Sequence, residues 1–493
     1  MRDSLSRRRL LRLAGFGAAS LAMRETATAA DMGDPGKPPN FIIVLCDNLG
    51  YGDLGCFGST KHRTPHVDRM AAEGLRLTGF YATSGVCTPS RASLMTGCYP
   101  RRVSLHVNER GGQVLFPVSP KGLHPDEITI AEVLKARGYA TACIGKWHLG
   151  DQAPFLPTRQ GFDSYFGIPY SDDMVGTADG RRPPLPLMRG ETVVEAPADC
   201  NTLTKRYTEE ATGFITANRC RPFFLYLAHA LPGSTTRPPA GEAFRGKSAN
   251  GPYGDAVEEI DWSTGEILAA VRELGLDAGT LLLWTSDNGA VQRNPPQGSN
   301  APLRGWGYTT AEGGMRVPCA VRWPGRVPAG AATSEICTVM DVLPTFALLA
   351  GARAPADRDI DGKDIWPILS GRPGAASPHE VFYYYFMDQL QAVRAGPWKL
   401  YLPLEGKKID FRGSTQKCRA QLYELGADVG EAVNLADRRP EVVARLAALA
   451  EKARRDLGDG DRDGERQRAA GFVTDPKPQR LPTASAASPP QGD

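Results

Sequence analysis

Continuous apolar runs rich in β-branched and aromatic residues recur along the chain, and segments with helical spacing of apolar residues lie between them. Such runs are typical of strands buried on both faces of a sheet. The predicted strands are Phe41–Leu45, Tyr139–Ile144, Phe223–Leu227, Leu281–Thr285 and Val317–Val321, and the predicted helices are Ile128–Arg137, Gly254–Leu274 and Met340–Ala350. This alternation predicts an α/β fold in which helices cover both faces of a large mixed sheet of mostly parallel strands.

The pattern changes beyond about residue 374. Val381–Phe386 and Trp398–Leu402 have the composition of strands, and Pro440–Leu457 has that of an amphipathic helix. We therefore expect a main domain over residues 38–375 and a smaller α+β subdomain with a short antiparallel sheet over residues 376–460. Charged residues, Pro, Ser and Ala dominate residues 461–493, and this composition predicts a tail that is disordered or loosely draped on the main domain.

The positive charge of the chain is concentrated at its N-terminus. The 493 residues carry a net charge of +3. Residues 1–30 hold six arginines against two acidic residues, so they contribute +4 and the remainder of the chain −1. Because residues 31–493 are nearly neutral, the net charge gives no support to a nucleic-acid partner.

Residues 1–30 also have the order of an export signal. Ser6–Arg12 is basic, Leu13–Met23 is moderately apolar and Thr26–Ala30 consists of small residues. The paired arginines resemble a twin-arginine signal, which a receptor reads and which leaves no permanent anchor; a basic amphipathic helix on a membrane is the alternative. No later stretch has the roughly 18 apolar residues that cross a bilayer. We therefore expect a bacterial protein that is exported, periplasmic or secreted, with no stable membrane anchor.

Polar residues follow four of the predicted strands at the points where the strands end. They are Asp47 and Asn48, Lys146 and His148, His229, and Asp287 and Asn288. In a parallel sheet the carboxyl ends of the strands meet at one edge, and ligands bind there. The sequence therefore predicts a single polar site at this edge of the sheet.

The most informative segment is Cys87-Thr88-Pro89-Ser90-Arg91. Taken alone, it places a thiolate or an anion against an arginine at the start of a helix, although most lone cysteines are simply buried apolar residues. Cys-Thr-Pro-Ser-Arg matches the signature of the type I sulfatases, and Gly138–His148 matches their second signature. The chain resembles this family from about residue 40 to the C-terminal subdomain, and the resemblance implies an alkaline-phosphatase-like fold.

In that family a formylglycine-generating enzyme oxidises the motif cysteine to Cα-formylglycine, and the hydrated aldehyde attacks sulfur. The resemblance therefore implies that Cys87 is the precursor of the nucleophile and that Arg91 holds the hydrate. Lys146 and Ser171 match residues that contact the sulfate. His148 matches a residue that takes a proton when the covalent intermediate breaks down.

A divalent metal is also expected, held by Asp47, Asn48, Asp287 and Asn288 together with the modified Cys87. Carboxylate and amide oxygens suit a hard cation, so we expect one Ca²⁺ per chain, with Mg²⁺ as the less favoured ion. The family usually has a second Asp where this chain has Asn48, which predicts weaker metal affinity or an Asn48 outside the coordination shell. The alternative for each Asp-Asn pair is an ordinary turn or helix cap.

Two residues that the resemblance leads us to expect are absent. A His after the third strand and a sulfate-binding Lys are replaced by Gly233 and Gly307. Losing one electrostatic contact to the transition state lowers the rate by about 10²–10³-fold. Either the reaction has changed or another group compensates, and His229, Arg237 and Arg304 are the candidates, with Arg304 expected to bind the substrate. The alternative for His229 is a hydrogen-bonded structural histidine at a strand end.

Three functions remain open at this point. The first is an enzyme, a calcium-dependent sulfatase that hydrolyses a small-molecule or carbohydrate sulfate ester, whether an aryl sulfate or a sugar sulfate. The second is a phosphodiester or phosphonate hydrolase on the same scaffold. The third is a degenerate sulfatase that binds sulfated ligands without turnover, which Gly233 and Gly307 would explain.

Overall fold

A computed structural model describes residues 37–177, 182–410 and 412–482. The predicted export signal at residues 1–30 lies outside the described residues. From Pro38 onward the chain forms one compact unit. Within the described ranges, no helix combines the length and the apolar character that crossing a membrane requires.

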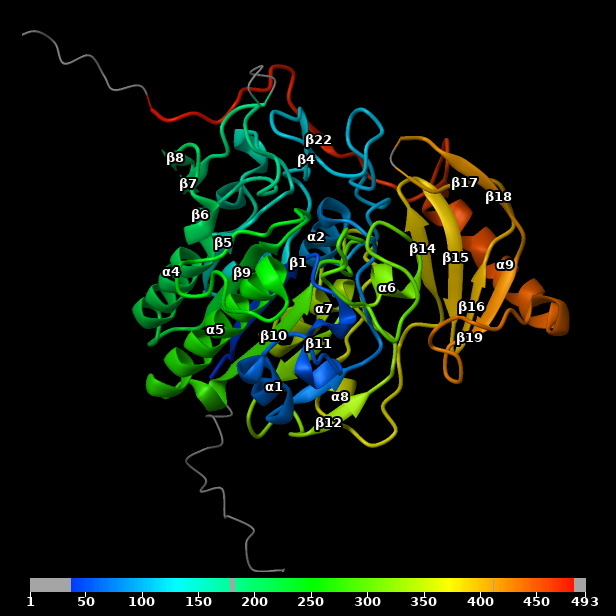
Figure 1. Ribbon diagram of the computed structural model, residues 1–493, viewed down its shortest axis with the longest axis horizontal. Coiled ribbons are helices and arrows are strands. Elements are labelled where there is room, and N and C mark those ends of the chain that lie inside the picture. Colours follow the sequence, from blue (N-terminus) through cyan, green and yellow to red (C-terminus); the bar gives the residue numbers. More distant parts are fainter. Residues whose placement is uncertain (1–36, 178–181, 411, 483–493) are drawn as a thin grey trace, which may run out of the picture. The chain divides into compact units, whose positions relative to one another are not determined.

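The centre of the molecule is a ten-stranded mixed sheet (Figure 1). Its five middle strands run parallel to one another in the order β10, β1, β9, β5 and β6. These strands are β10 (Thr280–Ser286), β1 (Asn40–Asp47), β9 (Phe223–Pro232), β5 (Ala140–Gly145) and β6 (Ser164–Gly167). The predicted α/β fold with a mostly parallel sheet is confirmed, and β1 lies in the middle, where both of its neighbours are parallel.

Shorter strands extend the sheet on both sides with changes of direction. Beyond β10 come β11 (Cys319–Arg322), β2 (Leu75–Leu77) and β12 (Ala331–Thr333), and beyond β6 come β7 (Leu187–Arg189) and β8 (Thr192–Glu195). The strand predicted at Val317–Val321 is β11, which begins two residues later and pairs antiparallel with β10. A separate two-stranded sheet joins β3 (Phe80–Tyr81) to β13 (Cys337–Thr338).

Helices cover both faces of the sheet because side chains on the buried strands alternate between two apolar layers. Phe41, Ile43 and Leu45 of β1 face one layer, and Ile42 and Val44 face the other. The first layer contains α2 (Cys87–Thr96), α3 (Ile130–Lys135) and α7 (Val342–Leu349), and the second contains α1 (Pro65–Ala72), α4 (Leu203–Ala217) and α5 (Gly251–Glu273). Two single-turn helices, α6 (Glu312–Met315) and α8 (Trp366–Leu369), lie in the later connections.

The C-terminal subdomain has the predicted antiparallel sheet. Its strands, in spatial order, are β14 (Phe382–Phe386), β15 (Gln389–Ala395), β16 (Trp398–Tyr401) and β19 (Gln421–Glu424). The helix α9 (Pro440–Asp456) packs on this sheet through Leu446, Ala450 and Ala453 (Figure 1). A hairpin of β17 (Leu404–Lys408) and β18 (Thr415–Cys418) lies beside β15, where the Gln391 side chain donates to the Lys408 carbonyl at 2.7 Å.

The prediction of a disordered tail from residue 461 is wrong for residues 461–482. After the hairpin of β20 (Gly458–Asp459) and β21 (Arg462–Asp463), the strand β22 (Gly471–Phe472) pairs with β4 (Lys121–Gly122) of the main domain. Arg468 contributes an ion pair of 2.7 Å to Glu127. The charged composition suggested solvation, but this charge has a partner in the main domain. Residues 483–493 lie outside the described residues.

Candidate active site

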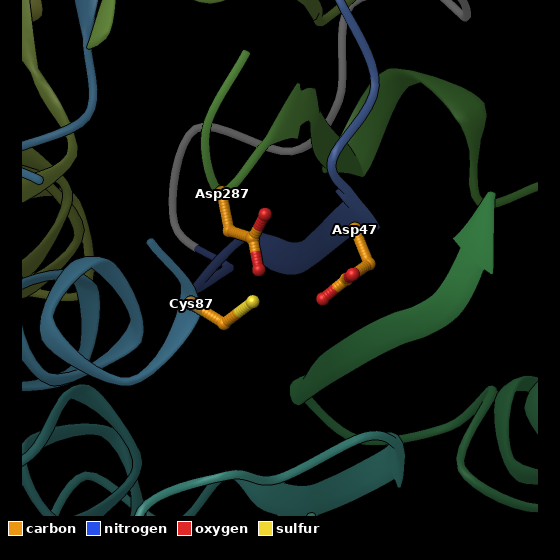
Figure 2. Close-up of side chains that lie close together, drawn as sticks. All are labelled: Asp47, Cys87 and Asp287. Atoms are coloured by element: carbon orange, nitrogen blue, oxygen red, sulfur yellow. The ribbon is translucent and has the colours of Figure 1, made fainter. Parts of the chain in front are cut away.

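Two carboxylates and one thiol converge at the carboxyl ends of β1 and β10. Asp47 is the last residue of β1, Asp287 directly follows β10, and Cys87 is the first residue of α2. Their ligand atoms all lie within 4.8 Å of one another, and no other group of three such ligands occurs in the described ranges. Figure 2 shows the three side chains pointing toward a common centre.

Arg91 holds the two carboxylates in place. It lies one helical turn after Cys87, so both side chains emerge from the same face of α2. One Nη atom of Arg91 lies 3.0 Å from Asp47 Oδ2 and 2.9 Å from Asp287 Oδ2, with all three side chains buried. The other donates to the backbone carbonyl of Lys146 at 2.7 Å. Arg91 therefore braces three strand ends at once.

Lys146 supplies a second buried cation at the end of β5. Its ammonium pairs with Asp47 and donates to Ser171 Oγ at 3.0 Å. Burial alone would lower the pKa of Lys146, but the Asp47 carboxylate raises it above its usual value. Burial likewise opposes ionisation of Asp47, and Lys146 and Arg91 outweigh it and lower the pKa of that carboxyl. Both partners are charged at neutral pH.

His148, two residues after Lys146, has an unused ring nitrogen. Its Nε2 lies 2.9 Å from the Leu115 carbonyl, and because a carbonyl can only accept, Nε2 carries the proton. The Nδ1 atom is buried and has no hydrogen-bond partner. Burial, followed by the charge of Lys146, lowers the pKa of His148 well below its usual value. The neutral imidazole therefore has a free lone pair that can accept a proton.

The two asparagines extend the oxygen-rich side of the cluster. Asn48, at a left-handed φ of 57°, donates from its side chain to Asp47 Oδ1 at 2.8 Å and from its backbone to Asp287 Oδ1 at 3.1 Å. Asn288 Nδ2 donates to Asn48 Oδ1 at 2.5 Å, while Asn288 Oδ1 is buried without a partner. An unsatisfied buried oxygen beside two carboxylates fits the donor set of a hard divalent cation.

His229 does not join the site, contrary to the prediction of a catalytic role. It is fully buried, and its Nε2 lies 3.3 Å from Ser263 Oγ of α5. The cause is a bulge, because Leu45 pairs with Ala228 but Asp47 pairs with Pro232. Burial alone lowers the pKa of His229 to about 3, and no charged group contributes. It is a neutral structural histidine.

The Arg304 side chain, predicted to bind the substrate, contacts residues of the C-terminal subdomain. Its guanidinium lies over the rings of Tyr401 and Tyr423, at 5.4 and 4.8 Å, and 3.4 Å from the Glu431 carboxylate. These partners belong to the C-terminal subdomain, so Arg304 joins the two parts of the molecule. Arg237, the other proposed substitute, is exposed.

The two glycines that replace expected residues differ in their surroundings. A Cβ at Gly307 would lie 2.4 Å from the Gly289 carbonyl oxygen, so neighbouring backbone occupies the space that a side chain would need. A Cβ at Gly233 would instead meet a side chain, the carboxylate of Asp172. Burial, followed by electrostatic interaction with Cys87, raises the pKa of Tyr308, the residue after Gly307, and a hydrogen bond with Ser234 opposes the shift. Sequence reasoning missed Asp172, because a second acidic residue after Ser171 carries no distinct signal.

The charges of the cluster indicate what it can bind. Asp47 and Asp287 are balanced by Arg91 and Lys146, so a divalent cation on the carboxylates would make the site positive. A positive, buried site with a proton acceptor stabilises an anion that gains charge as a bond breaks. The α/β sheet and this strand-end site define a hydrolase that acts on esters of a tetrahedral oxyanion.

Comparisons with known proteins identify the family of hydrolases. Residues 39–352 match the sulfatase family, and residues 308–455 match the C-terminal region of N-sulphoglucosamine sulphohydrolase. Steryl-sulfatase of Mus musculus is 38% identical over 478 residues, covering 80% of this chain and 76% of that protein. Arylsulfatase A of Homo sapiens is 37% identical over 454 residues, covering 84% of this chain and 87% of that protein. The chain belongs to the sulfatase family, the enzymes that hydrolyse sulfuric esters.

A solved structure supports the same assignment. The PsFucS1 sulfatase from Pseudoalteromonas sp. superposes with a TM-score of 0.75 at 26% identity, covering 85% of this chain and 90% of that chain. The predicted family and its alkaline-phosphatase-like fold are confirmed. The phosphonate and phosphodiester alternative is not favoured, because the family model and the relatives at 37–38% identity are sulfatases. A phosphonate monoester hydrolase of Agrobacterium radiobacter matches with a TM-score of 0.58 at only 18% identity, which shows a shared fold alone.

Proposed function

We propose that this enzyme hydrolyses a sulfate ester through Cα-formylglycine formed from Cys87, with one Ca²⁺ in the cluster. The observation that carries the proposal is the convergence of Asp47, Cys87 and Asp287 within 4.8 Å. Asp47, Asp287 and the unpartnered oxygen of Asn288 would hold the metal. The bound cation would supply positive charge for the sulfate oxygens and favour an ionised hydroxyl on the modified residue.

Each neighbouring side chain has a role that its contacts support. Arg91 forms ion pairs with both carboxylates and so keeps residue 87 and the metal ligands in position relative to one another. Lys146 and Ser171, already hydrogen-bonded to each other, offer donors to sulfate oxygens. His148 Nδ1 accepts the proton that is released when the aldehyde re-forms.

Asn48 weakens the metal site. Its amide bridges Asp47 and Asn288 by hydrogen bonds and supplies no negative charge where the family usually has a carboxylate. We therefore propose that Asn48 positions the ligands and that the metal is bound less tightly than in relatives with two Asp.

The substrate class follows from the family. The names of two relatives point to steryl and aryl sulfates, and the family model of the C-terminal region names a sulfated sugar. We therefore propose that the substrate is an aryl sulfate or a carbohydrate sulfate ester. The identity of the alcohol is decided by loops outside the charged cluster.

Maturation and export complete the proposal. A formylglycine-generating enzyme would modify Cys87, and residues 1–30, with Arg7, Arg8 and Arg9, would direct the folded protein through a twin-arginine route. Replacing these three arginines by lysine should retain the protein in the cytoplasm during cell fractionation. Unchanged export would contradict this part.

The test combines mass spectrometry with turnover. The peptide that carries Cys87, isolated from the native host, should contain the aldehyde in place of the thiol. The protein should release sulfate from 4-nitrophenyl sulfate in the presence of Ca²⁺, and Cys87→Ala should abolish this release. Cys220→Ala, which removes an exposed thiol, is the matched control and should retain it. Faster turnover of an aryl phosphonate would favour the alternative scaffold activity, and binding without turnover would indicate a degenerate sulfatase.

A further inference from the structure

A buried carboxylate lies where the chain lacks a side chain. Gly233 has a φ of 68°, and a Cβ added there would lie 3.0 and 3.2 Å from the two Asp172 carboxylate oxygens. Asp172 is 4% exposed and therefore fills the space into which a residue at 233 would extend. The Gly233 backbone also donates to the Asp47 carbonyl at 3.0 Å. The Asp172 carboxylate thus lies close to the metal-ligand cluster.

Side chains connect Asp172 to the same cluster. Lys146 donates to Ser171 Oγ at 3.0 Å, and Ser171 Oγ donates to Asp172 Oδ1 at 3.4 Å. No basic side chain within the described part of the chain forms an ion pair with Asp172 at 4.0 Å or less, so its charge is not directly neutralised. The titratable groups that face it are Asp173, Lys146, Asp47, Cys200 and Tyr207.

Burial and the environment favour the protonated form of this carboxyl. Burial, followed by the like charge of Asp173, raises the pKa of Asp172 to about 7, while Lys146 opposes the shift. A carboxyl with such a pKa retains its proton at neutral and mildly acidic pH and can give it up to a stronger base.

We propose that Asp172 is the proton donor to the leaving oxygen, in place of the residue that is missing at position 233. The inference rests on the proposed sulfatase function. As the sulfur–oxygen bond of the ester breaks, its electron pair stays on the leaving oxygen, which takes the carboxyl proton. The sulfuryl group passes to the nucleophile at position 87, and the carboxylate regains a proton from water. Ester and water are the only reactants.

The test compares two aryl sulfates that differ in their need for a proton. Nitrophenolate leaves without protonation, whereas phenolate is a poorer leaving group. Asp172→Asn should lower kcat/KM for phenyl sulfate by about 10²-fold or more and leave kcat/KM for 4-nitrophenyl sulfate nearly unchanged. Wild-type turnover of both substrates tests the sulfatase function itself, and the ratio between variants tests Asp172.

Asp173→Asn is the matched control, since it makes the same change one residue away on an exposed side chain. Well below pH 7, where Asp172 is protonated with or without the Asp173 charge, it should retain the ratio of kcat/KM between the two substrates. In the wild type, kcat/KM for phenyl sulfate should fall as pH rises through about 7, the pKa of Asp172. Removing the Asp173 charge should move this fall to lower pH. Equal losses on both substrates in Asp172→Asn, no loss on either, or an unmoved pH profile in Asp173→Asn would overturn the proposal.

Discussion

Replacing Arg91 by alanine should destabilise the protein more than almost any surface substitution. Its guanidinium lies 3.0 Å from Asp47 and 2.9 Å from Asp287, all fully or nearly fully buried. Two unit charges at 3 Å interact by about 5 kcal/mol at an effective dielectric constant of about 20. Both carboxylates would stay desolvated after the substitution. Breaking a buried pair from one side typically costs about 3–5 kcal/mol, and because Lys146 still faces Asp47, we expect a loss within that range.

The assay is urea unfolding of the metal-free protein. Arg63→Ala is the control, because its guanidinium lies 2.9 Å from Glu258 but its side chain is 79% exposed; this variant should lose less than about 1 kcal/mol. Saturating Ca²⁺ should narrow the difference between Arg91→Ala and wild type, since a cation on the same carboxylates replaces part of the lost charge. A loss from Arg91→Ala no larger than that from Arg63→Ala would refute the reasoning.

Four further substitutions test individual assignments. Asn48→Asp adds a carboxylate to the metal ligands and should raise Ca²⁺ affinity about tenfold by titration calorimetry; unchanged affinity would count against the metal site. Gly307→Lys should lower the melting temperature, because its Cβ would meet the Gly289 carbonyl at 2.4 Å and overpacking costs about 1–3 kcal/mol. An unchanged or higher melting temperature would contradict this. His229→Gln should leave kcat/KM for 4-nitrophenyl sulfate almost unchanged, whereas Lys146→Met should lower it about 10²–10³-fold. A loss of kcat/KM in His229→Gln as large as that in Lys146→Met would show that His229 takes part in catalysis.

The sheet was predictable because its strands are apolar on both faces. In β1, alternate side chains from Phe41 to Leu45 enter the two helical layers, so the run shows no alternation and indicates a central strand. Because ligand sites form where parallel strands end, the sequence also predicted that Asp47, Asp287 and Lys146 lie together. Local sequence was sufficient to predict this cluster, because the first polar residue after a buried parallel strand lies at the edge of the sheet where the strands end.

The errors arose where contacts between distant segments decide the outcome. His229 follows an apolar strand as Lys146 does, but the bulge opposite Asp47 directs it toward Ser263, and nothing in its neighbours signals a bulge. Arg304 pairs with Glu431, more than a hundred residues away.

Residues 461–482 are ordered for a similar reason. Their charges find partners in the main domain, as Arg468 does with Glu127, and composition alone cannot reveal such partners. Asp172 was overlooked because its significance depends on the empty position at Gly233.

The central claim is that residue 87 in its modified form carries out sulfate-ester hydrolysis. The most direct test is the rate of sulfate release from 4-nitrophenyl sulfate with Ca²⁺, measured across preparations in which the converted fraction of Cys87 has been quantified by mass spectrometry. We predict a rate proportional to the converted fraction, with none at zero conversion. A rate independent of conversion, or no rate in fully converted protein, would contradict the account.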